Sequence, residues 1–98
     1  MGLSSIITAT DSEIMERIGH RLRELRESRE LTQLEAAERA GIARRTLYRA
    51  ERGMNPTLET MIRLLRVYGR LPALDNFIPE TEVSPMALLR ESRAESDG

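Results

Sequence analysis

The stretch from residue 31 to residue 53 limits the possible folds of this chain more than any other. Thr32 and Glu35 have the spacing of a capping box, which predicts a helix over residues 33–40. Gly41 follows at the position where a helix end often adopts a left-handed conformation, and glycine adopts that conformation at little cost. This part of the chain therefore predicts a short helix that ends in a tight turn.

A second short helix is predicted after this turn, from residue 43 or 44 to residue 52, with Gly53 just beyond its end. Its apolar residues are expected to point inward: Ile42, Leu47 and Ala50. Three arginines lie on the opposite face: Arg44, Arg45 and Arg49. A helix held at a fixed angle on another helix, with arginines outside, suits the DNA major groove. We therefore expect a DNA-binding protein, although the same arginines would also suit a merely solvated face.

The chain before this helix pair is predicted to hold one longer helix. Thr10 and Glu13 have capping-box spacing, so this helix should begin near residue 11. Its apolar residues recur at steps of three and four and form one stripe: Ile14, Ile18, Leu22 and Leu25. Residues 1–10 show no helical period, and we expect a flexible N-terminal arm there.

Three further helices are predicted after the pair. Thr57 should cap the first, which Gly69 closes and which carries a buried stripe of Leu58, Met61, Ile62 and Leu65. Proline in a first helical turn predicts two more short helices, over residues 72–77 and 86–90. Residues 91–98 carry no such signal, and we expect a disordered tail. Together these signals predict an all-α fold.

Length and composition exclude several classes of protein. The 98 residues suffice for one domain with a modest core. The absence of cysteine excludes a disulfide framework and thiolate chemistry, and it suits a cytoplasmic protein. No apolar run approaches the roughly 18 residues of a membrane span, and we expect no signal segment. His20 is the only histidine and lies on a charged helix, so we expect no enzyme, no metal and no other cofactor.

Charge is distributed unevenly along the chain. The net charge is −1, yet residues 17–70 hold thirteen arginines against seven acidic residues. Residues 1–16 hold three acidic residues and no base, and residues 71–98 hold six acidic residues against two arginines. A basic centre between acidic ends favours DNA binding. Every basic residue is arginine, which suits contacts to guanine and phosphate, although a codon bias would produce the same composition.

The central stretch resembles the helix-turn-helix domain of the Cro and phage-repressor type, the XRE-like group of bacterial and phage regulators. The resemblance covers about residues 16–69 and rests on Arg26, Leu31, Thr32, Gln33, Glu35, Ala37, Gly41, Arg44, Thr46, Leu47, Glu51, Gly53, Pro56 and Leu58. Ala36 departs from it, because family members often carry a larger apolar residue there. The resemblance implies a five-helix DNA-binding domain over residues 11–69, followed by a short helical extension over residues 70–90.

The resemblance also implies roles for individual residues. Base reading is implied for the start and outer face of the second helix: Ala43, Arg44, Arg45 and Arg49. An arginine at such a position can donate two hydrogen bonds to guanine, so a half-site that contains guanine is expected. Phosphate contacts are expected for Gln33, Thr46, Tyr48, Arg52 and Asn55, although Thr46 and Tyr48 could instead contact the protein itself. Arg26 and Glu51 are expected to form a partly buried structural ion pair.

We expect a homodimer that binds an inverted repeat in double-stranded DNA, most simply its own promoter, and acts as a repressor. Apolar residues beyond the domain offer a dimer interface, unless they fold back on their own helices: Leu71, Leu74, Phe77, Ile78, Val83, Met86 and Leu89. The C-terminal segment also resembles, over a short stretch, the tails of HipB-like antitoxin regulators, which bind an operator and a kinase toxin. A further alternative is a protein-interaction module that does not bind DNA.

Overall fold

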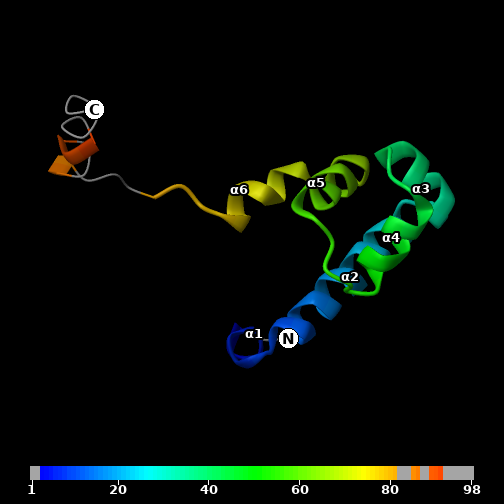
Figure 1. The fold of residues 1–98 in the computed structure, drawn as a ribbon, viewed down its shortest axis with the longest axis horizontal. Helices are drawn as coiled ribbons and strands as arrows, with labels where there is room; N and C mark the ends of the chain where they lie inside the picture. Colours follow the sequence, from blue (N-terminus) through cyan, green and yellow to red (C-terminus); the bar gives the residue numbers. More distant parts are fainter. Residues whose placement is uncertain (1–2, 82–84, 87–88, 92–98) are drawn as a thin grey trace.

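The computed structural model describes residues 3–81, 85–86 and 89–91, and these residues contain helices but no strand. The helices are α1 (Leu3–Thr8), α2 (Asp11–Ser28), α3 (Gln33–Ala40), α4 (Arg44–Glu51), α5 (Leu58–Val67), the 3₁₀ helix η1 (Leu71–Ala73) and α6 (Leu74–Phe77), as labelled in Figure 1. The short α4 packs on the long α2 and on α3, and α3 packs in turn on α5. The all-α prediction is confirmed.

Threonine hydroxyl groups cap the starts of α2, α3 and α5, as predicted. Thr10, Thr32 and Thr57 each accept a hydrogen bond from the backbone N–H three residues later, at 3.2, 3.1 and 3.1 Å. The capping box of α3 is complete, because Glu35 Oε1 accepts from the Thr32 N–H at 3.0 Å. This hydrogen bond holds the pKa of Glu35 below its usual value. At α2 the Glu13 carboxylate accepts from the Thr10 hydroxyl instead, at 3.1 Å, so only half of the predicted box forms.

Two arginine side chains bond to carbonyl groups at helix ends. The first end is that of α3, where Gly41 has a φ of 69° in the left-handed region. Arg63 on α5 donates from Nη1 to the backbone oxygen of Ala40 at 3.2 Å. Arg29, which follows α2, donates from Nε to the backbone oxygen of Tyr68 at the end of α5, also at 3.2 Å. Both arginines therefore satisfy carbonyl groups that a helix end leaves unpaired, and both connect distant elements.

The hydrophobic core lies where α2, α3, α4 and α5 meet. Leu47 on α4, Leu64 on α5 and Tyr68 after α5 are completely buried. Small side chains on α3, Ala36 and Ala37, are buried between them and allow the neighbouring helices to approach closely. The remaining buried hydrophobic residues are Leu22, Leu31, Ala40 and Ala50. This core holds α4 against α2 and α3.

At Gly19, α2 and α4 approach each other backbone to backbone. A methyl group at Gly19 would lie only 2.6 Å from the backbone oxygen of Glu51 and 2.8 Å from that of Ala50. Gly53 makes the reciprocal approach, because a methyl group there would lie 2.9 Å from the Cα atom of Glu16. These contacts, which the sequence analysis did not predict, set how the end of α4 rests on α2.

Residues 1–10, for which the sequence predicts a flexible arm without a helical period, contain the helix α1 (Leu3–Thr8). The helix has six residues, which is less than two turns. Such a short segment cannot display an apolar period, so sequence periodicity could not reveal it.

The predicted buried stripe of α5 is wrong in part. Leu58 is 58% exposed, and Met61, Ile62 and Leu65 are only partly buried. Thr60 and Leu64, one turn apart, are the buried residues of this helix. The helix therefore packs on α3 through a face next to the predicted one. Of the predicted stripe, Leu58, Met61 and Leu65 lie on the side of α2 and α6.

The C-terminal extension begins as predicted, since η1 and α6 together cover residues 71–77. Residues 78–81 then run away from the domain (Figure 1). Residues 85–86 and 89–91 are helical, at the place of the helix predicted over residues 86–90. Val83 and residues 92–98, most of the tail predicted to be disordered, lie outside the described residues. Within the described part of the chain, no helix is both long and apolar enough to cross a membrane.

Candidate nucleic-acid interface

The outer face of α4 is basic and open to solvent. Arg44, Arg45 and Arg49 are exposed, and none of them has an ion-pair partner in the part of the chain that the structure describes. Leu47 and Ala50 on the other side of the same helix are buried. The helix is therefore amphipathic, and its outer surface carries three unpaired guanidinium groups.

The start of α4 combines two features that destabilise a free helix. Ala43 is the N-cap residue and makes no side-chain capping bond, and the first turn holds no acidic residue. Arg44 and Arg45 instead place positive charge at the positive end of the helix dipole, a cost of about 0.3–1 kcal/mol per charge. An anion or the acceptor edge of guanine would interact favourably with this helix start.

Two hollows flank α4, so that the helix stands between them as a ridge. The first has a volume of about 340 Å³ and is lined by Gln33, Arg44, Arg45 and Tyr48. The second has a volume of about 410 Å³, and its lining includes Ala43, Arg45, Thr46, Arg49 and Asn55. The structure thus brings together, along one ridge, residues that were assigned to base reading and to phosphate contact from the sequence.

The remaining predicted phosphate contact, Arg52, lies just after α4. Its guanidinium group lies over the ring of Tyr48, 5.8 Å from the ring centroid. Tyr48 is 47% exposed, so the pair forms part of the surface. Thr46 is also exposed, and its hydroxyl makes no hydrogen bond within the described residues. Asn55 is exposed in the turn that follows, with a φ of 47°, a left-handed conformation that asparagine tolerates.

A buried ion pair lies beneath this surface. Arg26 on α2 donates from Nε to Glu51 Oε2 at 2.7 Å and from Nη2 to Glu51 Oε1 at 3.1 Å. Its Nη1 donates to the backbone oxygen of Leu31 at 2.8 Å. The hydrogen bond to Glu51 raises the pKa of Arg26, although burial acts in the opposite direction. The contact that the resemblance implies is therefore present, and it ties α2, the turn before α3, and α4 together.

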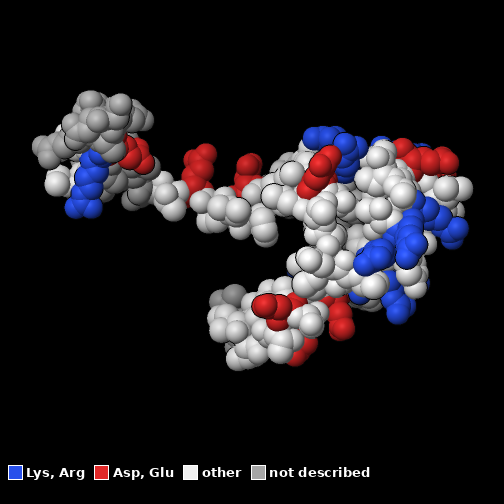
Figure 2. All heavy atoms as spheres, viewed as in Figure 1, with Lys and Arg blue, Asp and Glu red and all other residues white. Residues whose placement is uncertain are grey.

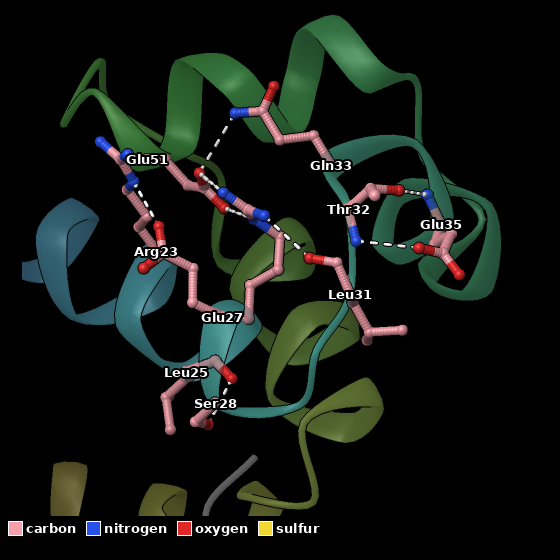
Figure 3. Close-up of polar contacts among 10 residues, drawn as sticks. Arg23, Leu25, Glu27, Ser28, Leu31, Thr32, Gln33, Glu35 and Glu51 are labelled. Carbon is pink, nitrogen blue, oxygen red and sulfur yellow. Dashed lines mark hydrogen bonds and ion pairs between the residues drawn. The ribbon is translucent and has the colours of Figure 1, made fainter.

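Gln33 joins this ion pair at the first residue of α3. Its Nε2 donates to Glu51 Oε1 at 3.2 Å, and Figure 3 shows the amide nitrogen directed at that carboxylate. The sequence predicts separate roles for Gln33 and Glu51 and does not predict their contact. The two residues are 18 positions apart, so no local spacing indicates their contact.

An apolar groove is a second feature that the sequence analysis missed. It lies between α2, α5 and α6 and has a volume of about 550 Å³. Its apolar lining includes Met15, Ile18, Leu58, Met61, Leu65, Leu74 and Phe77. A signal was present in the sequence, because the apolar residues of α5 cover a wider face than one packed helix can bury.

The residues predicted to form a dimer interface lie in and beyond this groove. Leu74 and Phe77 line it, and Leu71 and Leu74 are partly buried. The others that the structure describes are exposed: Phe77 by 64%, Ile78 by 73%, Met86 by 61% and Leu89 by 46%. Neighbouring apolar side chains are thus open to solvent on the single chain.

Arginine side chains are concentrated in one part of the molecule. Figure 2 shows them over the region of α3, α4 and α5, where some acidic side chains also lie, and it shows further acidic side chains towards α1 and along the chain after α6. The exposed arginines of α4 are therefore part of the basic centre predicted from the sequence. A negatively charged polymer is the natural ligand of such a surface.

A short amphipathic helix, packed after a tight turn on a second helix and exposing arginines, defines the helix-turn-helix class of DNA-binding module. A family model described as helix-turn-helix matches residues 22–74, which is more than half of the chain. The chain belongs to this XRE-like helix-turn-helix family, whose members are DNA-binding regulatory domains. In a comparison with curated proteins, no match was found.

Proposed function

We propose that this protein is a homodimeric repressor that binds an inverted repeat in its own promoter region. One observation carries the DNA-binding part of the proposal: α4 exposes three arginines that have no ion-pair partner among the described residues. Unpaired charges at this site have no role in the stability of the free protein, whereas DNA offers them both phosphates and base edges.

In this proposal the base-reading edge consists of the start and middle of α4. Arg44 and Arg45 lie in the first turn, the part of a recognition helix that reaches base edges. Each can donate two hydrogen bonds to the O6 and N7 atoms of guanine. Arg49 lies one turn beyond Arg45 and reaches a neighbouring base, and Ala43 allows close approach of the backbone. Recognition of guanine in each half-site follows from this arrangement.

Phosphate contacts flank this reading edge. Gln33 borders the hollow on one side of α4, together with Tyr48. Thr46 and Asn55 border the hollow on the other side. Arg52 lies beside Tyr48 and adds a positive charge close to the hollow that Gln33 and Tyr48 border. These contacts fix the position of α4 in the groove without reading the sequence.

The dimer is proposed to form through the apolar groove and the exposed residues after it. A groove of about 550 Å³ with a largely apolar lining is costly to leave in water. A second copy is the occupant that the DNA-binding role favours, because one such domain reads only a few base pairs and two read an inverted repeat. Phe77, which lines the groove, and Ile78, the exposed residue after it, are the proposed contacts between the two copies.

Fluorescence anisotropy with the full-length protein tests this function. The probes are the DNA upstream of its own coding sequence and a shuffled duplex of the same composition, each titrated at two salt concentrations. We expect tighter binding to the upstream DNA, and weaker binding to both duplexes at higher salt because phosphate contacts release counterions. The variant Arg44→Ala should lose about 1–3 kcal/mol on the upstream DNA and less on the shuffled duplex.

The matched control is Arg66→Ala, which removes an exposed arginine of α5. It changes the net charge by the same amount as Arg44→Ala. It should leave the preference for the upstream DNA unchanged. Binding that does not respond to salt would contradict the proposal, as would an equal loss of preference in both variants.

A further inference from the structure

We propose that Glu51, neutralised by Arg26, is a positioning residue that orients the carboxamide of Gln33 for its phosphate contact. This inference rests on the proposed DNA-binding function and adds a role for a buried residue that cannot itself reach DNA. The Glu51 side chain is 4% exposed, whereas Gln33 is partly exposed and borders the hollow beside α4. Glu51 therefore acts on the DNA surface only through Gln33.

The geometry fixes which end of the amide faces the protein. The Glu51 carboxylate can only accept hydrogen bonds, and it accepts one from Gln33 Nε2 at 3.2 Å. An amide turned the other way would place its oxygen against the carboxylate, which is unfavourable. Figure 3 shows the resulting arrangement, with the amide nitrogen of Gln33 towards Glu51. The orientation of Gln33 is thus set before DNA arrives.

This orientation leaves a donor free for a phosphate oxygen. The amide nitrogen carries two hydrogens, and Glu51 is its only hydrogen-bond partner among the described residues. A side chain that is already ordered loses less conformational entropy when it binds, so the contact gains affinity. Gln33 is also the first residue of α3, where free backbone N–H groups favour the same anion.

The ion pair with Arg26 allows the Glu51 carboxylate to lie close to the proposed DNA surface. A lone carboxylate close to the DNA surface would repel the phosphates, but two hydrogen bonds from Arg26, at 2.7 and 3.1 Å, neutralise Glu51. Arg26 also donates to the backbone oxygen of Leu31, just before the N-cap residue of α3. The ion pair therefore holds both the side chain of Gln33 and the helix start from which it extends.

A double-mutant cycle on DNA binding separates positioning from mere stability. Gln33→Ala is compared in the wild-type protein and in an Arg26→Met/Glu51→Met background, because replacing both partners of a buried ion pair by apolar residues is often neutral for stability. In the wild type, we expect Gln33→Ala to weaken binding about three- to tenfold on both upstream and shuffled duplexes. In the double-methionine background, the loss should fall below about twofold, because the amide is no longer oriented.

The control is Arg49→Ala, which should cause the same loss of affinity in both backgrounds because Arg49 does not touch the ion pair. Equal losses for Gln33→Ala in the two backgrounds would overturn the inference while leaving the proposed function intact. If the wild type binds no DNA and Arg49→Ala changes nothing, the proposed function itself fails.

A second measurement on the free wild-type protein does not depend on any variant folding. Gln33 is the only glutamine of the chain, so its side-chain NH₂ group is readily assigned by nuclear magnetic resonance. We expect its order parameter to approach the value of about 0.85 that is typical of a rigid backbone. An order parameter below about 0.6, which is typical of a flexible group, would overturn the inference, whatever the result on DNA.

Discussion

Tyr68 is completely buried, yet its hydroxyl has no hydrogen-bond partner among the described residues. Burial raises the pKa of this phenol to about 12, and the charge of Glu51 adds to the effect while Arg26 opposes it. The side chain therefore supplies apolar volume to the core, and its polar atom contributes little to stability. A buried hydroxyl without a partner has lost its hydrogen bonds to water and gained none in return.

We predict that Tyr68→Phe is neutral or stabilising, with a change in the free energy of unfolding within about 1 kcal/mol at neutral pH. The wild type should also lose stability as the pH rises from about 10 towards 12, because the unfolded chain ionises first. The phenylalanine variant should lack this part of the loss.

Urea unfolding at neutral and alkaline pH measures both effects. Tyr48→Phe is the control, since Tyr48 is 47% exposed. This variant should lose stability at alkaline pH as the wild type does. A destabilisation of about 2 kcal/mol or more by Tyr68→Phe would show that the hydroxyl has a partner.

At the scale of residues, the sequence predicted one buried contact and missed another. The family resemblance implied the pairing of Arg26 with Glu51, because two matched positions of one known fold are assigned together. The same resemblance could not indicate that Gln33 donates to Glu51, since that contact depends on how α3 packs beside α4. The buried position of Tyr68 was missed for a similar reason: it follows α5 and is covered by the core only after the helices pack.

Local chemistry determines where the helices begin and end. Thr32 and Glu35 satisfy each other's backbone groups, so the start of α3 could be predicted from four consecutive residues. The packing face of α5 could not be predicted from the sequence, because the polar Thr60 is buried and the apolar Leu58 is exposed. Helix existence follows from local hydrogen bonds and periodicity, whereas the buried face follows from the neighbours that a helix meets.

The approach of α2 to α4 is a close contact between backbones. The three atoms nearest to a methyl group at Gly19 all belong to the backbone, so a larger residue cannot be accommodated by rotation of neighbouring side chains. We predict that Gly19→Ala destabilises the protein by about 1–3 kcal/mol, even though alanine favours helices, because α4 must shift on α2.

Urea unfolding checks this value, with Ser12→Ala as the control at an exposed position in the first turn of the same helix. The control should change the free energy of unfolding by less than about 0.5 kcal/mol. A Gly19→Ala variant as stable as the wild type would contradict the close packing of α2 and α4.

At the scale of the whole molecule, one surface is basic and another is apolar. Three exposed arginines lie on α4, while the apolar groove lies between α2, α5 and α6. Charge along the sequence predicted the first surface, because α4 and its neighbours come from the basic part of the chain. The wide apolar face of α5 indicated an unpartnered surface, but the groove brings residues of α2, α5 and α6 together, so its location depends on the fold.

We predict that Phe77→Asp shifts the full-length protein from dimer towards monomer in analytical ultracentrifugation. The charge would have to be buried against the partner, which is strongly unfavourable. Ile7→Asp is the matched control, because Ile7 is exposed by 72% on α1 and lies outside the groove. A Phe77→Asp variant that stays dimeric would contradict the proposed interface. A monomeric wild type would point to another protein, such as a toxin, as the occupant of the groove.

Selection of bound sequences from random double-stranded DNA tests the central claim most directly, because it reports binding, sequence and spacing together. For the wild-type protein, we predict an inverted repeat with guanine in each half-site and half-site centres about 10–10.5 base pairs apart. The Arg44→Ala/Arg45→Ala variant should lose the preference for guanine while retaining weak, salt-dependent binding. Failure of the wild type to enrich any sequence would contradict the assignment of α4 as a recognition helix.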